Sequence, residues 1–242
     1  TCWGNNAYGQ LGNEDFYHGD SPDNMGDNLH VIDLGTNRRA KDISSDQYYS
    51  CAILENDEVK CWGHGANGTL GYGDTINRGN LFGQMGDSLP VVDLGAGRTA
   101  LKVDAGENHT CALLDNFTVK CWGYNGTGQL GQGNTSERGS GANQMGDNLP
   151  AIDLGADLAA IDISAGWQTS CAILNDFSLK CWGQNPRGQL SQGDTANRGS
   201  GANQMGDFLP PIDMGPGRSV RAVSVGWEHV CAINDLGGLR CW

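Results

Sequence analysis

Residues 109–123 read HTCALLDNFTVKCWG, and this stretch decides the fold. Nine residues separate its two cysteines, and a polar turn divides two short alternating or β-branched runs. The same pattern returns at intervals of 60 residues, as YSCAILENDEVKCWG at 49–63, TSCAILNDFSLKCWG at 169–183 and HVCAINDLGGLRCW at 229–242. A fixed period of this length within one chain indicates stacked copies of one structural unit.

Each period contains four short runs suited to β-strands, divided by Gly, Asn and Asp. In the second copy they are LPVVDLG from Leu89, ALKVDAG from Ala100, HTCALLD from His109 and TVKCWG from Thr118. A helical solenoid would need an apolar period of about 3.6 residues, which we do not find, whereas four short strands make a propeller blade. We therefore predict an all-β chain, a β-propeller of four-stranded antiparallel blades at about 29–62, 89–122, 149–182 and 209–242.

Eight cysteines recur in these copies. They are Cys51, Cys61, Cys111, Cys121, Cys171, Cys181, Cys231 and Cys241. In an antiparallel hairpin the two cysteines of one copy face each other at about 4.5 to 5.5 Å between Cα atoms, within reach of a disulfide. Zinc ligands usually stand about two to four residues apart, so we favour disulfides over a metal site. Disulfides predict an extracellular or cell-surface location.

Five Asn-X-Ser/Thr sequons agree with that location and are candidates for glycosylation. They begin at Asn67, Asn108, Asn116, Asn125 and Asn134. Asn67 and Asn125 lie in the long connectors between blades, so we expect these two to carry sugar.

The connectors between blades, such as residues 123–148, run to 26 residues, well beyond the usual length of about 2 to 6. Any specific activity is therefore expected in these loops. Three aspartates recur in them among Asn and Gly, and such oxygen-rich loops are candidates for weak calcium binding; they are Asp87, Asp147 and Asp207. Their spacing does not match an EF-hand and Asx residues are ordinary turn formers, so we favour no metal. Recurring arginines offer pairing with aspartates instead; they are Arg78, Arg138 and Arg198.

Composition excludes several function classes. Asp and Glu total 28 against 15 Lys and Arg, a formal charge of −13, which opposes binding to nucleic acid or anionic lipid. No run approaches the roughly 18 apolar residues of a spanning helix, so direct membrane insertion is not expected. The sequence lacks GxSxG, HExxH and a Walker loop. We predict neither an enzyme nor a cofactor.

Two residue types in the repeats could carry chemistry or packing. His109 and His229 share a repeat position with Tyr49 and Thr169, which favours a strand residue with local hydrogen bonds over a general base. Three tryptophans follow a cysteine at the end of a blade, where they would pack over disulfides or between blades; they are Trp62, Trp122 and Trp182. A platform on which sugars stack is the alternative for them.

The ends of the sequence fit a piece of a longer chain. Cys2 matches the second cysteine of a pair whose partner would lie before residue 1, and residues 1–4 match the last strand of a blade. We expect residues 1–242 to form one propeller domain or a fragment of one.

The units GQLG at Gln10, Gln129 and Gln189, Gly-X-X-His-Thr-Cys-Ala-Leu at 106–113 and Val-Lys-Cys-Trp-Gly resemble the regulator of chromosome condensation repeat. The resemblance covers the whole chain and implies a seven-bladed propeller, of which four blades are present; a closed ring of four blades is the alternative. Nucleotide exchange is not carried over, since this chain differs from the nuclear member in its cysteines and its acidity.

Three functions follow as hypotheses. The first is an extracellular scaffold that presents its repeated inter-blade loops to protein or glycan partners, within a larger homo- or hetero-assembly. The second is a secreted recognition module or enzyme inhibitor that acts through one face of the ring, marked by an aromatic loop such as residues 80–83. The third is a hydrolase in the central channel, which would need acidic or His residues from different blades to converge on the axis.

Overall fold

The computed structural model describes residues 1–14, 17–18, 23 and 25–242, and within these residues the chain is a β-propeller of four blades. Each blade is an antiparallel sheet. The first is β3 (Ala40–Ser45), β4 (Tyr49–Leu54) and β5 (Val59–Gly63), and the second is β6 (Ala100–Ala105), β7 (His109–Leu114) and β8 (Val119–Gly123). The third is β9 (Ala160–Ala165), β10 (Thr169–Leu174) and β11 (Leu179–Gly183), and the fourth is β12 (Val220–Val225), β13 (Val230–Asn234) and β14 (Leu239–Cys241).

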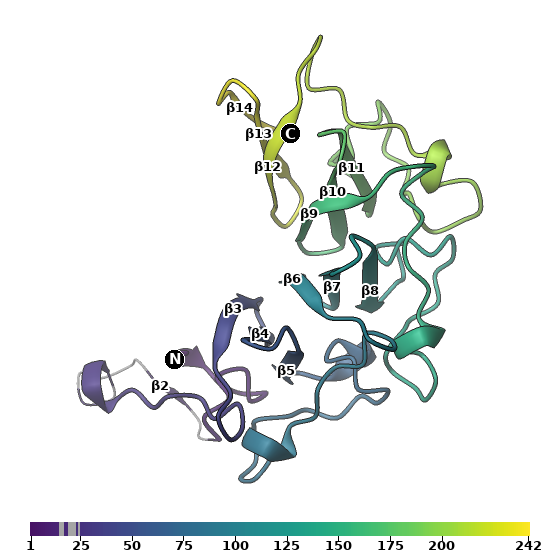
Figure 1. The fold of residues 1–242 in the computed structure, drawn as a ribbon. Helices are drawn as coiled ribbons and strands as arrows, with labels where there is room; N and C mark the ends of the chain where they lie inside the picture. Colours follow the sequence, from purple (N-terminus) through teal and green to yellow (C-terminus); the bar gives the residue numbers. More distant parts are fainter. Residues whose placement is uncertain (15–16, 19–22, 24) are drawn as a thin grey trace.

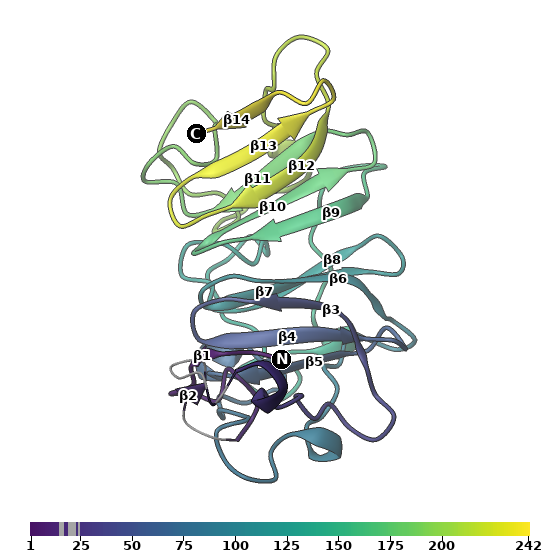
Figure 2. The same cartoon turned by 90° about the vertical axis from the view of Figure 1, so that its left-hand side faces the viewer.

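The sheets follow one another along an arc (Figure 1), and the view turned by 90° shows them stacked in chain order (Figure 2). The first strand of each sheet lies on the concave side of the arc, where β3 contacts β6, β6 contacts β9 and β9 contacts β12. A separate pair, β1 (Gly4–Asn5) with β2 (Tyr17–His18), precedes the first sheet. Among the described residues no helix has the length and apolar character needed to cross a membrane.

The predicted all-β propeller is confirmed, but the prediction of four strands per blade is wrong. Residues 89–94, the expected first strand of the second blade, form no ladder; Val92 N–H donates to the Val59 carbonyl of the preceding sheet at 2.8 Å. Pro90 has no N–H to donate, which removes one of the bonds that a ladder would need. Ile152 and Ile212 repeat the contact with Val119 and Leu179. Each blade is therefore a sheet of three strands.

The core lies between neighbouring sheets. One apolar cluster joins Ile53 and Val59 of the first sheet to Val103 and Leu114 of the second, with Val92 wedged in the same cluster. The middle strands β4, β7 and β10 are buried along their whole length, because each is covered on both faces. Burial of this kind explains why these strands are apolar on both sides instead of alternating.

The third strand of each sheet is tied to the second by a disulfide. Cys51 pairs with Cys61, Cys111 with Cys121, Cys171 with Cys181 and Cys231 with Cys241, at 4.0 to 4.1 Å between Cα atoms. The same residues face each other in the strand register. Each bridge therefore closes a single hairpin and links no two blades. Among the described residues Cys2 is the free cysteine.

The tryptophans that follow these cysteines hold the blades together. The indole N–H of Trp122 in the second sheet donates to the Thr69 carbonyl of the connector that leaves the first sheet, at 2.9 Å. Trp182 makes the same bond to the Gln129 carbonyl, and Trp62 to that of Gln10. All three rings are buried, so packing between blades is their role and a glycan has no access to them.

His109 sits at the interface between the second and third blades and is fully buried. Its Nε2 lies 2.8 Å from Ser170 Oγ, and Ser170 donates its own proton to the Gln129 carbonyl at 2.9 Å, so the imidazole donates from Nε2. Nδ1 has no hydrogen-bond partner among the described residues. Burial disfavours the charged ring and lowers the pKa of His109 to about 4.

We predict a pH-dependent loss of stability from His109. The folded chain keeps the ring neutral, whereas the unfolded chain takes up a proton near the ordinary pKa of 6.5. The difference in His109 protonation between the two states therefore has no effect on stability above pH 6.5. Below it, the free energy of unfolding falls as pH drops from 6.5 towards 4, by on the order of 3 kcal/mol. Urea unfolding at several pH values should give a flatter profile for His109→Gln than for the unaltered protein. His229→Gln, at an exposed copy of the same repeat position, is the control. Parallel profiles for the unaltered protein and His109→Gln would contradict the prediction.

Candidate functional site

Four short turns meet at one end of the inner strands. They join the first and second strands of the sheets and span residues 46–48, 106–108, 166–168 and 226–229. Glu107 N–H donates to the Gly166 carbonyl at 3.3 Å, and Trp167 N–H donates to the Gly226 carbonyl at 3.4 Å. The second, third and fourth turns are thus bonded in series through their backbones, whereas the Gln47 N–H of the first turn donates to Asp46 of its own turn.

Glycine permits this close approach. A Cβ on Gly106 would lie 2.2 Å from the Gly166 carbonyl oxygen, and one on Gly166 would lie 2.3 Å from that of Gly226. Any side chain there would push the turns apart, since the obstacle is backbone. The second, third and fourth turns therefore form a fixed rim.

The middle residue of each turn faces a common hollow of about 200 Å³. We call this hollow the mouth and define it by Asp46, Gln47, Glu107, Trp167 and Trp227. The four middle positions are Gln47, Glu107, Trp167 and Trp227, so the copies differ here although the strands that follow repeat closely. All four blades contribute to one site: the first two contribute polar side chains and the last two contribute indoles.

Two indoles form one wall of the mouth. The rings of Trp167 and Trp227 lie 5.2 Å apart between centroids, with their planes inclined by 60°. Trp227 is 66% exposed, and Trp167 is partly buried beneath it. Large aromatic side chains held in this way are the residues that dominate binding energy at protein interfaces.

Two carboxyl groups form the other part of the mouth. Asp46 comes from the first blade and accepts the Gln47 N–H, and Glu107 comes from the second. Burial raises the pKa of Asp46; burial, and then the charge of Asp46, raise the pKa of Glu107. No salt bridge involves either residue within the described part of the chain. The mouth therefore holds negative charge without a paired cation.

Comparison with known proteins identifies the repeat. The family described as "Regulator of chromosome condensation (RCC1) repeat" matches residues 101–129 and 160–189. This propeller contains RCC1-type repeats. Among curated relatives, the ultraviolet-B receptor UVR8 of Arabidopsis thaliana is 30% identical over 208 residues, which cover 85% of this chain and 41% of that protein. The chain thus spans less than half the length of that relative.

Two solved structures share the fold. The crystal structure of human WBSCR16 superposes with a TM-score of 0.70 at 18% identity, over 99% of this chain and 56% of that chain. Yeast RCC1 (Prp20), in its complex with Kap60, gives a TM-score of 0.63 at 17% identity, over 86% of this chain and 44% of that chain. At this identity the likeness concerns the fold alone.

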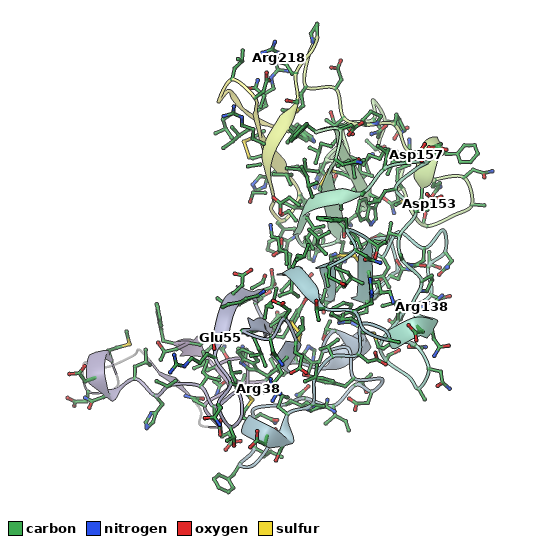
Figure 3. All side chains as sticks on the ribbon, in the orientation of Figure 1. Arg38, Glu55, Arg138, Asp153, Asp157 and Arg218 are labelled. Atoms are coloured by element: carbon green, nitrogen blue, oxygen red, sulfur yellow. A yellow bond between two sulfur atoms is a disulfide. The ribbon has the colours of Figure 1, made fainter. Side chains whose placement is uncertain are left out.

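The long connectors of these RCC1 repeats carry structural contacts on the outer, convex side of the arc, where Figure 3 places Arg138 and Asp153. Arg78 pairs with Asp74 at 2.8 Å and Arg198 with Asp194 at 2.6 Å, as the recurrence of arginine and aspartate suggested. Arg138 differs, because Asn134 replaces the aspartate there and the guanidinium donates to the Glu137 carbonyl at 3.1 Å. The recurring leucines, Leu70, Leu130 and Leu190, are buried. Most residues that repeat among the connectors are therefore engaged within the protein.

The aspartates considered as calcium ligands lie beside lysine ammonium groups. Asp147 accepts the Ala96 N–H at 3.0 Å, and Lys120 Nζ nearby donates to the Leu94 and Gly146 carbonyls at 2.9 and 2.8 Å. Lys60 stands beside Asp87, and Lys180 beside Asp207, with the same bonds. At each of the three aspartates, a lysine ammonium group thus supplies the positive charge that a calcium ion would bring. No group of three potential metal-ligating side chains occurs in the described ranges.

One connector differs from the others at its tip. Residues 80–83 carry Leu81 and Phe82, which are 61% and 96% exposed, whereas Ala142 and Ala202 occupy the position of Phe82 in the next two connectors. This is the aromatic loop expected to mark a recognition surface. It is separate from the mouth, because the two share no lining residue.

The sequons differ in accessibility. Asn125 is 0% exposed; its amide donates to the Asn134 and Ser136 carbonyls at 2.8 and 3.0 Å and accepts the Leu130 N–H at 3.0 Å. Asn116 lies exposed at the tip of the β7–β8 hairpin, while Asn67, Asn108 and Asn134 are partly buried. In the folded state Asn125 is a structural residue of the connector, contrary to our expectation that it would carry sugar.

We predict that Asn116 carries a glycan when the chain is expressed in a eukaryotic secretory host. Asn116→Gln should remove one glycan from the intact mass without affecting stability. Asn125→Gln should leave the glycan mass unchanged and lower the free energy of unfolding by about 1–3 kcal/mol, since it disturbs buried hydrogen bonds. Sugar found at Asn125 by peptide mapping would contradict this assignment.

The sequence alone did not single out the mouth. Trp167 and Trp227 share one repeat position in the sequence. Asp46 and Glu107, in contrast, stand in different copies and look like ordinary turn residues. The available signal was the middle turn position, which changes from Gln to Glu to Trp between copies while the strand that follows the turn repeats closely.

Proposed function

We propose that this chain is an extracellular or cell-surface binding module that recognises a protein partner at the mouth of the propeller. The observation that carries the proposal is Trp227, which is 66% exposed and packs at an angle against Trp167, at a hollow to which all four blades contribute. An exposed indole on a backbone-bonded rim offers a large contact area at little cost in conformational entropy.

The mouth suits this role better than the repeated loops. A scaffold that presents identical loops needs their repeated side chains free for a partner, yet the repeated leucines and arginines are engaged within the connectors. A protein partner agrees with the complex of yeast RCC1 with Kap60, in which a protein of this fold is bound to another protein. Nucleic acid is disfavoured by the charge of −13.

The extracellular location rests on the four hairpin disulfides, because thiols are kept reduced in the cytosol. We expect protein purified from its native source under non-reducing conditions to resist alkylation at every cysteine of the four pairs. Reduction should add two hydrogens per bridge to the intact mass. Free thiols at Cys51, Cys111 or Cys171 in freshly isolated protein would contradict an extracellular location.

We predict that Trp227→Ala abolishes partner capture. Immobilised protein would be cross-linked to secreted and cell-surface proteins of the source and the captured protein identified by mass spectrometry. Loss of the same partner on Trp227→Ala, with retention by Phe177→Ala, supports the mouth as contact surface. Phe177 is an exposed aromatic in the β10–β11 hairpin, at the opposite end of β10, and serves as the matched control.

Contact through the connector tip is the second candidate, because Phe82 is almost fully exposed. In the same experiment Phe82→Ser distinguishes the two surfaces. Partner loss on Phe82→Ser with retention by Trp227→Ala would assign recognition to residues 80–83 and refute the mouth.

A further inference from the structure

We propose that the mouth binds an organic ammonium group, of the kind that a lysine or methylated lysine side chain of a protein partner presents. This inference rests on the proposed function only in taking the ammonium group to belong to a protein. Its physical basis is the combination of two indoles and two unpaired carboxyl groups in one hollow.

The charge of the mouth favours a cation over an anionic or neutral ligand. Asp46 and Glu107 come from different blades and share the hollow, and the lining contains no Lys, Arg or His among the described residues. Glu228 follows Trp227 but is already paired with Arg187 at 3.3 Å. A bound cation would offset the repulsion between the two carboxylates, and the charge of −13 draws cations towards the surface.

The aromatic wall favours an alkylated cation. An indole face is the strongest aromatic partner for a cation, and aromatic rings are the usual receptors for quaternary ammonium groups. Trp167 and Trp227 are inclined by 60°, so the two rings form a corner instead of a flat platform. A corner contacts a compact, roughly spherical group on two sides, whereas a sugar ring stacks on a flat face.

The size of the mouth fits a side-chain group. Drug-sized ligands occupy pockets of roughly 300–1,000 Å³, and the mouth measures about 200 Å³. The backbone bonds from Glu107 to Gly166 and from Trp167 to Gly226 hold its walls in place, so binding requires little rearrangement.

Choline and its neutral isostere, in which a tert-butyl group replaces trimethylammonium, test the proposal. Isothermal titration at low ionic strength should show saturable choline binding that is about tenfold or more tighter than binding of the isostere, because only choline carries the charge. Trp227→Ala and Glu107→Gln should each weaken choline binding by about tenfold.

The matched control for Glu107→Gln is Glu55→Gln. Glu55 is an exposed carboxylate just past the end of β4, at the far end of that strand from the turn at 46–48. Choline affinity should not change in this variant or in Phe177→Ala. Circular dichroism and urea unfolding of every variant establish that the fold is kept.

Three results would overturn the ammonium assignment. They are equal affinity for choline and the isostere, absence of choline binding, and binding of a neutral sugar such as N-acetylglucosamine that is lost in Glu107→Gln. The last would favour a glycan site, and turnover of a glycoside there would favour a hydrolase, whose acidic pair Asp46 and Glu107 could form. If choline fails while Trp227→Ala still loses the protein partner, the proposed function stands and only this inference falls.

Discussion

The structure depends on one recurring hydrogen bond, from the indole N–H at the end of a third strand to a carbonyl in the connector that arrives from the preceding sheet. Trp122 makes it to Thr69 and Trp182 to Gln129. A sheet of three short strands cannot bury both of its faces alone. The connector therefore reaches across to the next sheet, and its buried leucine fills the space between the two.

This constraint accounts for the unusual length and similarity of the connectors. Their repeated residues place a buried leucine and a lysine contact at the blade boundaries, as Leu130 and Lys120 illustrate, and two of the connectors add an arginine–aspartate pair. The disulfides stabilise single hairpins and do not join blades, so the contacts between blades are non-covalent. Local cross-links and long connectors together offset a core that is divided into several small clusters.

The proposed binding site lies at the turn positions where the repeated copies differ in sequence. The strands and connectors have to repeat so that every blade packs on the next. The middle residue of each rim turn is not needed for that packing. Gln47, Glu107, Trp167 and Trp227 are therefore free to differ, and all four line one hollow, where glycine contacts hold the last three turns together. A propeller in this way converts four separate sequence positions into a single asymmetric site.

The sequence by itself determined the all-β propeller, the hairpins with their facing cysteines and the packing role of Trp62, Trp122 and Trp182, because these follow from local patterns that recur at a fixed period. Only the tertiary structure decided that residues 89–94 add no fourth strand, that Asn125 is buried and that Asp46 and Glu107 share one mouth with Trp167 and Trp227. Asn125 is buried by bonds within its own connector, and residues 89–94 pack on the preceding sheet, so only the mouth depends on which blade faces which. Contacts between residues about 60 positions or more apart leave no trace in local periodicity, since they arise when the inner strands gather around one axis.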